Sequence, residues 1–102
     1  MHDKTIAELA DCLKNGDFTS AELTRHYLSR IERLDTRLNS FITLAADTAL
    51  EAAERADALL RAGEAGPLTG IPIAHKDIFC TRGLKTSCGS RMLDNFLAPY
   101  NA

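Results

Sequence analysis

The sequence predicts an α/β fold in which three helices are followed by the first strands of a sheet. Capping signals and apolar residues at helical spacing fill residues 5–62, and an apolar run follows at residues 71–79. Helical spacing indicates a helix that packs by one face, whereas a short apolar run between turn residues is typical of a buried strand. We therefore expect residues 1–102 to be an incomplete N-terminal portion of a single domain, helical over 1–62 and forming the start of the sheet over 63–102.

The first two helices begin at capping boxes, in which a threonine hydroxyl caps a backbone amide and a glutamate three residues later reaches back. Thr5 and Glu8 form the first box, and Thr19 and Glu22 form the second. Gly16 ends the first helix, because glycine readily adopts the left-handed conformation that follows a helix. The apolar stripes of the two helices are Ile6, Leu9, Ala10 and Leu13, and then Leu23, Tyr27, Ile31 and Leu34.

The third helix is predicted over the alanine-rich residues 45–62 and ends at Gly63. Residues 40–44, which precede it, are interpreted either as a short strand or as an extended link. The surface of the third helix carries two acid–base pairs spaced i,i+4 with the acid first, the favourable orientation along a helix: Glu51–Arg55 and Asp57–Arg61.

The strand expected over residues 71–79 begins near Pro72, because proline lacks the N–H that an interior position of a sheet requires. Residues 85–88 are interpreted as a second extended segment, and Ser90 as the cap of a short helix through Phe96. A strand that is apolar on both faces needs neighbours on both sides, and the chain supplies few. We therefore expect this half of the chain to begin a larger sheet.

The composition is that of one small globular domain. The chain has 102 residues, of which 45% are apolar and 25% charged, and its net charge of −2 gives no electrostatic reason to expect direct binding of nucleic acid. No apolar run is long enough for a signal peptide or a membrane span. The three cysteines form no C-x-x-C pair and do not cluster with histidine. This pattern argues against a disulfide framework and a zinc site, and it favours a cytoplasmic location.

Lys76 is the main candidate for chemistry, because it and Asp77 interrupt the apolar run. Burial of an unpaired ammonium is costly, so the ordinary alternative is that Lys76 reaches water or pairs with an acid such as Asp77. A lysine that is kept neutral is instead a base. A free lysine has a pKa of about 10.4, so a base that works near neutral pH must be desolvated or lie near other cations. Four neighbours supply part of the apolar surface that desolvation requires: Ile71, Ile73, Ile78 and Phe79.

The histidines have simpler interpretations. His75 lies next to Lys76 and would face the other side of a strand, where we expect it to pack or to form a hydrogen bond. His2 and His26 are expected to face solvent.

The serines, cysteines and glycines near Lys76 are also interpreted as structural. Ser87 is expected to be a strand residue and Ser90 a helix cap. Cys80 and Cys88 lack an adjacent base and are expected to be small buried residues. The glycines are spaced too loosely for a phosphate loop and predict turns: Gly70, Gly83 and Gly89.

The segment that contains Lys76 resembles a known motif. Residues 67–77, Pro-Leu-Thr-Gly-Ile-Pro-Ile-Ala-His-Lys-Asp, are similar to the lysine motif of the amidase-signature family, and Thr81, Gly83, Thr86, Gly89 and Ser90 continue the match. Within that family, the chain most resembles the glutaminase (A) subunits of the aspartyl/glutamyl-tRNA amidotransferases, and the resemblance covers essentially the whole chain. The segments that carry this closer match are residues 74–81, 86–90 and 92–100, with 19–23 and 38–41 in the helical part; Asn101 stands where the family commonly has aspartate.

The resemblance implies a mixed sheet and a Ser–Ser–Lys mechanism. In such enzymes the lysine, here Lys76, is the base, a bridging serine relays the proton, and a second serine attacks the amide. Both serines belong to a glycine- and serine-rich signature that has no counterpart in this sequence. We therefore expect this chain by itself to be inactive.

By the same resemblance, the whole protein hydrolyses glutamine and passes ammonia to a partner, which amidates misacylated tRNA in protein synthesis. The implied partners are the B and C subunits of a heterotrimer. The tRNA, ATP and Mg²⁺ are handled by a partner subunit, and no cofactor is expected in this chain. Two alternatives stay open: a stand-alone amidase of the same family with another amide substrate, and a non-catalytic helical interaction module.

Overall fold

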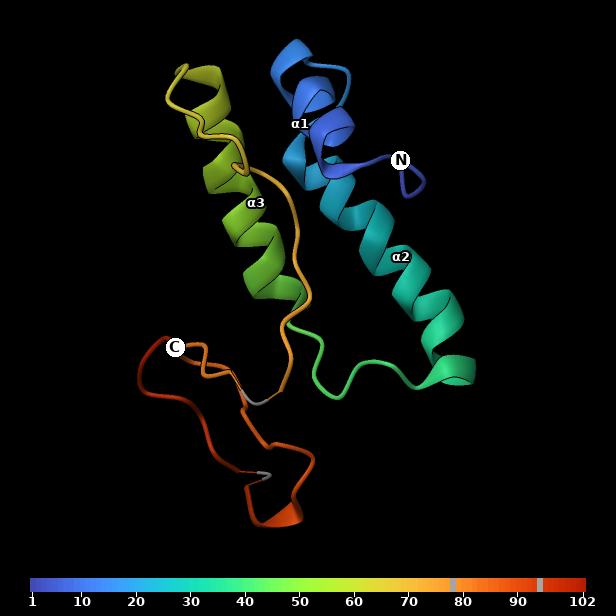
Figure 1. The fold of residues 1–102 in the computed structure, drawn as a ribbon, viewed down its shortest axis with the longest axis vertical. Helices are drawn as coiled ribbons and strands as arrows, with labels where there is room; N and C mark the ends of the chain where they lie inside the picture. Colours follow the sequence, from blue (N-terminus) through green and yellow to red (C-terminus); the bar gives the residue numbers. More distant parts are fainter. Residues whose placement is uncertain (78, 94) are drawn as a thin grey trace. The chain divides into compact units, whose positions relative to one another are not determined.

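The computed structural model describes residues 1–77, 79–93 and 95–102. Figure 1 shows its elements, which in chain order are α1 (Ile6–Asn15), α2 (Ser20–Leu38), α3 (Ala46–Arg61) and the short 3₁₀ helix η1 (Arg91–Leu93). The chain forms two compact units. The helical unit consists of Met1–Leu38 and Ala46–Pro72, and the lysine unit consists of Asn39–Ala45 and Ile73–Ala102.

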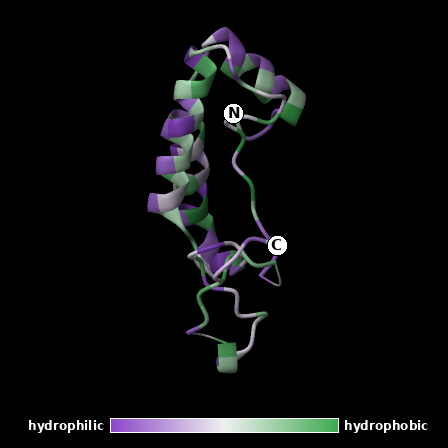
Figure 2. Cartoon of the chain, turned by 90° about the vertical axis from the view of Figure 1, so that its left-hand side faces the viewer, coloured by the Kyte–Doolittle hydropathy of each residue, from purple (hydrophilic) through white to green (hydrophobic). Residues whose placement is uncertain are grey.

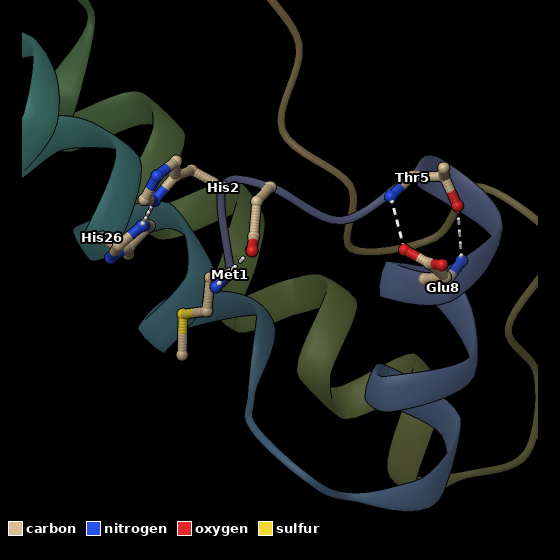
Figure 3. Close-up of polar contacts among 6 residues, drawn as sticks. Met1, His2, Thr5, Glu8 and His26 are labelled. Carbon is tan, nitrogen blue, oxygen red and sulfur yellow. Dashed lines mark hydrogen bonds and ion pairs between the residues drawn. The ribbon is translucent and has the colours of Figure 1, made fainter.

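The three predicted helices are confirmed, and the capping boxes start the first two. The Thr5 N–H donates to Glu8 Oε2 at 2.9 Å, and the Glu8 N–H donates to Thr5 Oγ1 at 3.2 Å (Figure 3). At the start of α2, the Glu22 N–H donates to Thr19 Oγ1 at 3.1 Å, and the Thr19 N–H donates to Glu22 Oε1 at 3.4 Å. Gly16 ends α1 in the left-handed conformation, with φ +77°.

The core of the helical unit lies where the amphipathic faces of the helices meet. Hydrophilic and hydrophobic segments alternate along these helices (Figure 2), as expected when one face of each helix packs. The predicted stripes supply most of the core, although Ile6 is 56% exposed. The four buried side chains of this core are Leu9, Leu13, Phe18 and Leu23, with Tyr27, Leu60 and Ile71 packed against them.

A carboxylate from α3 caps the N-terminus of α2. Asp57, 8% exposed, accepts from the Ser20 N–H at 2.6 Å and from the Ala21 N–H at 3.1 Å. The predicted Asp57–Arg61 pairing is therefore wrong, because the first N–H groups of a helix have no partner within it and attract a carboxylate. Among the described residues, no ion pair joins Glu51 to Arg55 either, and an exposed pair of this kind contributes little.

The turn before residue 71 is attached to the same place. The hydroxyl of Ser20, a residue that is 1% exposed, donates to the Gly70 carbonyl oxygen at 2.8 Å. Gly70 has φ +88°, and a Cβ added there would lie 3.2 Å from both Leu13 Cδ1 and Ser20 Cβ. Gly70 is thus in a turn, as predicted, and it is also the point at which the backbone approaches α1 and α2 closely.

The predicted strands are not formed in the described part of the chain. Residues 71–77 have no strand partner, and Ile73 is 81% exposed rather than buried. The one pairing of strand type among the described residues is an isolated antiparallel bridge between Lys85 and Leu97. The prediction failed because a strand is defined by repeated hydrogen bonds to a neighbouring strand, and among the described residues the segment 87–89 contacts residues 71–77 only at Asp77 and forms no such ladder.

Three smaller expectations concern the same part of the chain. Residues 40–44 form a link without strand structure, with a bend at Ile42. The helix predicted through Phe96 is limited to η1. The proposed contribution of Ile78 to an apolar surface, and any role of Asp94, lie outside the described residues.

None of the described helices has the length and apolar character that crossing a membrane requires.

His2 and His26 face each other instead of both facing solvent. His2 Nδ1 and His26 Nε2 are 3.1 Å apart, so one ring donates to the other, and the rings are nearly parallel (Figure 3). Partial burial lowers the pKa of His26, and the positive charges of the N-terminus and His2 lower it further. The structure corrects the expectation for His26, which is half-buried, while His2 is exposed.

We predict that Asp57→Ala destabilises the helical unit by about 2–3 kcal/mol, because it leaves two buried N–H groups without their charged acceptor. Asp57→Asn should cost less, since the amide oxygen still accepts one hydrogen bond. Urea denaturation followed by circular dichroism measures both. Glu54→Ala, an exposed acid on α3, is the matched control and should change stability by no more than about 0.5 kcal/mol. Equal effects of Asp57→Ala and Glu54→Ala would contradict the capping role.

We also predict that His26 makes the helical unit less stable in mild acid. Its pKa is lowered in the folded chain, so the unfolded chain takes up a proton first as the pH falls below about 6.5, and stability decreases from there downward. His26→Gln should remove this part of the pH dependence. Urea midpoints between about pH 7.5 and 5 test the prediction, and an unchanged slope in the variant would refute it.

Candidate active site around Lys76

Lys76 lies in a turn of the lysine unit and its side chain is exposed. Its carbonyl oxygen accepts from the Phe79 N–H at 3.0 Å, which closes the turn. Although Lys76 and Asp77 are sequence neighbours, no ion pair joins them in the described part of the chain. Of the two ordinary interpretations of Lys76, the structure of this chain therefore favours the one in which the side chain reaches water.

Asp77 is instead bound to residues 87–89. One carboxylate oxygen accepts from the Ser87 N–H at 3.1 Å. The other accepts a short hydrogen bond from the Ser87 hydroxyl and a longer one, 3.4 Å, from the Gly89 N–H. The Asp77 carbonyl oxygen also accepts from the Cys88 N–H at 3.1 Å. We call these four residues, Asp77, Ser87, Cys88 and Gly89, the Asp77 network.

The conformation of the 87–89 segment brings its successive N–H groups toward Asp77. Cys88 has φ +53° and Gly89 has φ +74°, so both are in the left-handed region. Consecutive N–H groups in such a turn form a concave site for an anion. The Ser87 hydroxyl foremost, and then the Ser87 N–H, lower the pKa of Asp77. The carboxylate is therefore stabilised in its charged form.

Hydrogen bonds around the Lys85–Leu97 bridge hold the rest of this unit. The Gly83 N–H donates to the Ala98 carbonyl at 2.9 Å, the Ala98 N–H donates to the Leu84 carbonyl at 3.0 Å, and the Thr86 N–H donates to the Phe96 carbonyl at 3.2 Å. Near the end of the chain, the Asn101 side chain accepts from the Arg82 N–H at 2.9 Å.

The structural interpretation of the two serines is confirmed in part. Ser90 caps η1, since its Oγ accepts from the Met92 N–H at 3.3 Å and its carbonyl accepts from the Leu93 N–H at 3.1 Å. Ser87 is 6% exposed, but it is not a strand residue: its side chain binds Asp77. No sequence signal reveals this contact, because the two residues are ten positions apart in a segment without regular structure.

The other predicted residues have structural contacts. His75 Nδ1 lies 3.0 Å from Thr81 Oγ1, and its ring stacks on Phe79, so the expected hydrogen-bonding role is confirmed. Cys80 is half-buried, whereas Cys88 is exposed, which corrects the expectation of burial there. The described residues contain no group of three or more histidine, cysteine, aspartate or glutamate side chains able to hold a metal ion.

The site therefore presents an exposed lysine whose neighbouring carboxylate is engaged elsewhere. Sequence comparison gives the class of protein: residues 22–102 match the amidase family, and the chain belongs to it. The match covers the lysine unit, α3 and nearly all of α2, whereas α1 precedes it.

Individual relatives are more specific. Three relatives align with all 102 residues, and each is named as the A subunit of a glutamyl-tRNA(Gln) amidotransferase: that of Nitrosococcus oceani is 65% identical, that of Methylococcus capsulatus 64%, and that of Thioalkalivibrio sulfidiphilus 61%. The chain spans 21% of the length of each of these relatives.

We predict that the Asp77 carboxyl group titrates below its usual range, and that Ser87→Ala moves its titration upward by removing the main stabilising donor. The network should contribute stability above about pH 3.8, the ordinary pKa, and lose that contribution as the pH falls through the lowered value. Carboxyl ¹³C NMR between about pH 2 and 6 measures both effects. Ser90→Ala is the matched control, and an Asp77 titration that does not differ between the two variants would contradict the assignment.

Proposed function

We propose that this chain is the N-terminal part of a glutaminase subunit, the A subunit of an amidotransferase that acts on misacylated tRNA. The observation that carries this proposal is the 65% identity over the whole chain to a protein of that name. The lysine motif lies within the aligned residues, and the relatives' name supplies the reaction class that the family match alone leaves open.

In the proposed reaction, Lys76 is the general base. It accepts a proton through a bridging serine from a second serine, which attacks the side-chain amide carbon of glutamine. The C–N bond then breaks, the proton returns to the leaving nitrogen, and ammonia departs. Water hydrolyses the acyl-serine and releases glutamate. Both serines would come from the part of the relatives that this chain does not span, so Lys76 is the catalytic residue that we assign here.

The same proposal accounts for the exposure of apolar side chains around Lys76. Ile73 is 81% exposed and Phe79 48%, which is costly if these side chains remain in water. We propose that in the longer protein residues 71–77 pair with further strands of a mixed sheet, which would cover these side chains. The same covering would exclude water from Lys76, and exclusion of water favours the neutral form that a base requires.

The proposal extends to partners and location. The ammonia would pass to a B subunit, with a C subunit completing a heterotrimer that works in the cytoplasm. ATP and Mg²⁺ would activate the tRNA-bound carboxyl group at the partner's site, and no step on this chain passes through them. The residues that we assign to this chain act only on glutamine.

A chimera tests the proposal with this chain's own residues. In the Nitrosococcus oceani relative, the residues that align with this chain are replaced by it, and the chimera is produced with that organism's partner subunits. We predict that the chimera releases ammonia from glutamine and that the 102-residue chain alone does not. Lys76→Arg should lower turnover at least about 100-fold, because arginine keeps the charge but has no accessible neutral form.

Lys85→Arg is the matched control, since Lys85 is an exposed lysine of the same unit, and it should leave turnover unchanged. Circular dichroism should show that both variants fold. Wild-type turnover by the Lys76→Arg chimera would rule out the base role. A chimera that hydrolyses other amides but not glutamine would favour a stand-alone amidase, and a chimera inactive on every amide despite folding would favour a non-catalytic module.

A further inference from the structure

We propose that Ser87 is a positioning residue for Lys76: by binding the Asp77 carboxylate, it keeps that carboxylate away from the lysine amine. This inference rests on the proposed function, because it concerns how Lys76 serves as a base. It gives Ser87 a role in the reaction that does not require contact with the substrate.

The problem that Ser87 solves follows from the sequence itself. Asp77 directly follows Lys76, so its carboxylate is near enough to approach the proposed base unless it is bound elsewhere. A carboxylate beside an ammonium stabilises the charged form of the lysine. The lysine would then lose its proton only at higher pH, and it would be a poorer proton acceptor near neutrality. An enzyme that uses Lys76 as a base therefore needs to direct Asp77 elsewhere.

The Asp77 network meets this need with three donors, two of which come from Ser87. The Ser87 N–H binds one carboxylate oxygen at 3.1 Å, and the Ser87 hydroxyl binds the other. The second oxygen has one further donor, the Gly89 N–H, at the longer distance of 3.4 Å. Removal of the Ser87 hydroxyl would leave that oxygen with a single weak contact, free to turn toward the amine.

Burial makes the Ser87 hydroxyl an effective donor. Ser87 is 6% exposed and its neighbour Thr86 is 4% exposed, so water competes little for the bond to Asp77. By contrast, Lys76 is exposed and forms no ion pair with Asp77 in the described part of the chain.

Other charged or titratable groups lie near Lys76 and Asp77 in the sequence and in the segment that leads to Ser87. Within the described residues, none of them forms an ion pair with Asp77. His75 is bound to Thr81. The remaining groups are Cys80, Arg82, Lys85 and Cys88. The donors of residues 87–89 are therefore the contacts that determine where the carboxylate points.

The test is the pH dependence of glutamine hydrolysis by the chimera. Ser87→Ala should move the acid limb of the pH–rate profile to higher pH by about 1 unit, because the freed carboxylate stabilises the ammonium form of Lys76. The double variant Ser87→Ala/Asp77→Asn should return the limb to its original position, since no carboxylate remains. Ser87→Thr, which keeps a hydroxyl, should behave like the wild type, and Ser90→Ala is the matched control.

If the acid limb of the pH–rate profile does not move in Ser87→Ala and turnover falls equally at every pH, the role of Ser87 is purely structural. That result would overturn the proposal. A shift that persists in the double variant would also overturn it, because the shift would not come from Asp77.

A second measurement separates this proposal from the proposed function. In the 102-residue chain itself, NMR of the Lys76 side chain should show a titration midpoint that rises in Ser87→Ala and returns in the double variant. If the chimera does not hydrolyse glutamine, the proposed function fails while this titration still decides whether Ser87 holds Asp77 away from Lys76. Identical midpoints in the wild type and Ser87→Ala would refute the role.

Discussion

The contact on which the helical unit depends is the buried carboxylate of Asp57 at the N-terminus of α2. A helix begins with N–H groups that have no partner within it, and here Ser20 and Ala21 donate theirs to one side chain from α3. Because a buried carboxylate without donors would be costly, α2 and α3 must meet at this point. Ser20 then extends the junction, since its hydroxyl binds Gly70 and so attaches the segment that leads to the lysine motif.

The lysine unit is held together in a different way. Among its described residues, the buried ones are small or polar: Thr86, Ser87 and Ala98. Its large apolar side chains are mostly exposed, so backbone hydrogen bonds and the Asp77 network, rather than a packed core, determine its conformation. The exposure of these apolar side chains agrees with the proposal that further strands cover the lysine unit in a longer protein. Burial of the side chains there would stabilise both the sheet and the site.

Lys76 and Asp77 are adjacent residues of opposite charge that form no ion pair in the described part of the chain. From the sequence alone, Asp77 is a possible partner of Lys76, but in the structure of this chain its carboxylate is bound by residues 87–89. The residue that achieves this, Ser87, was identified from the sequence only as a structural serine. Its contact arises where a left-handed turn at Cys88 and Gly89 returns the chain to Asp77.

The sequence by itself determined the features whose causes lie within one helical turn. The capping boxes Thr5–Glu8 and Thr19–Glu22 join residues three apart, so the starts of two helices could be read directly. Only the tertiary structure decided that Asp57 binds Ser20, a residue 37 positions away, instead of the nearby Arg61. Tertiary structure also decides whether the run expected as a strand over residues 71–79 becomes one, because a strand forms only where another segment offers hydrogen bonds to it. The residues of the run themselves do not specify which segment that is.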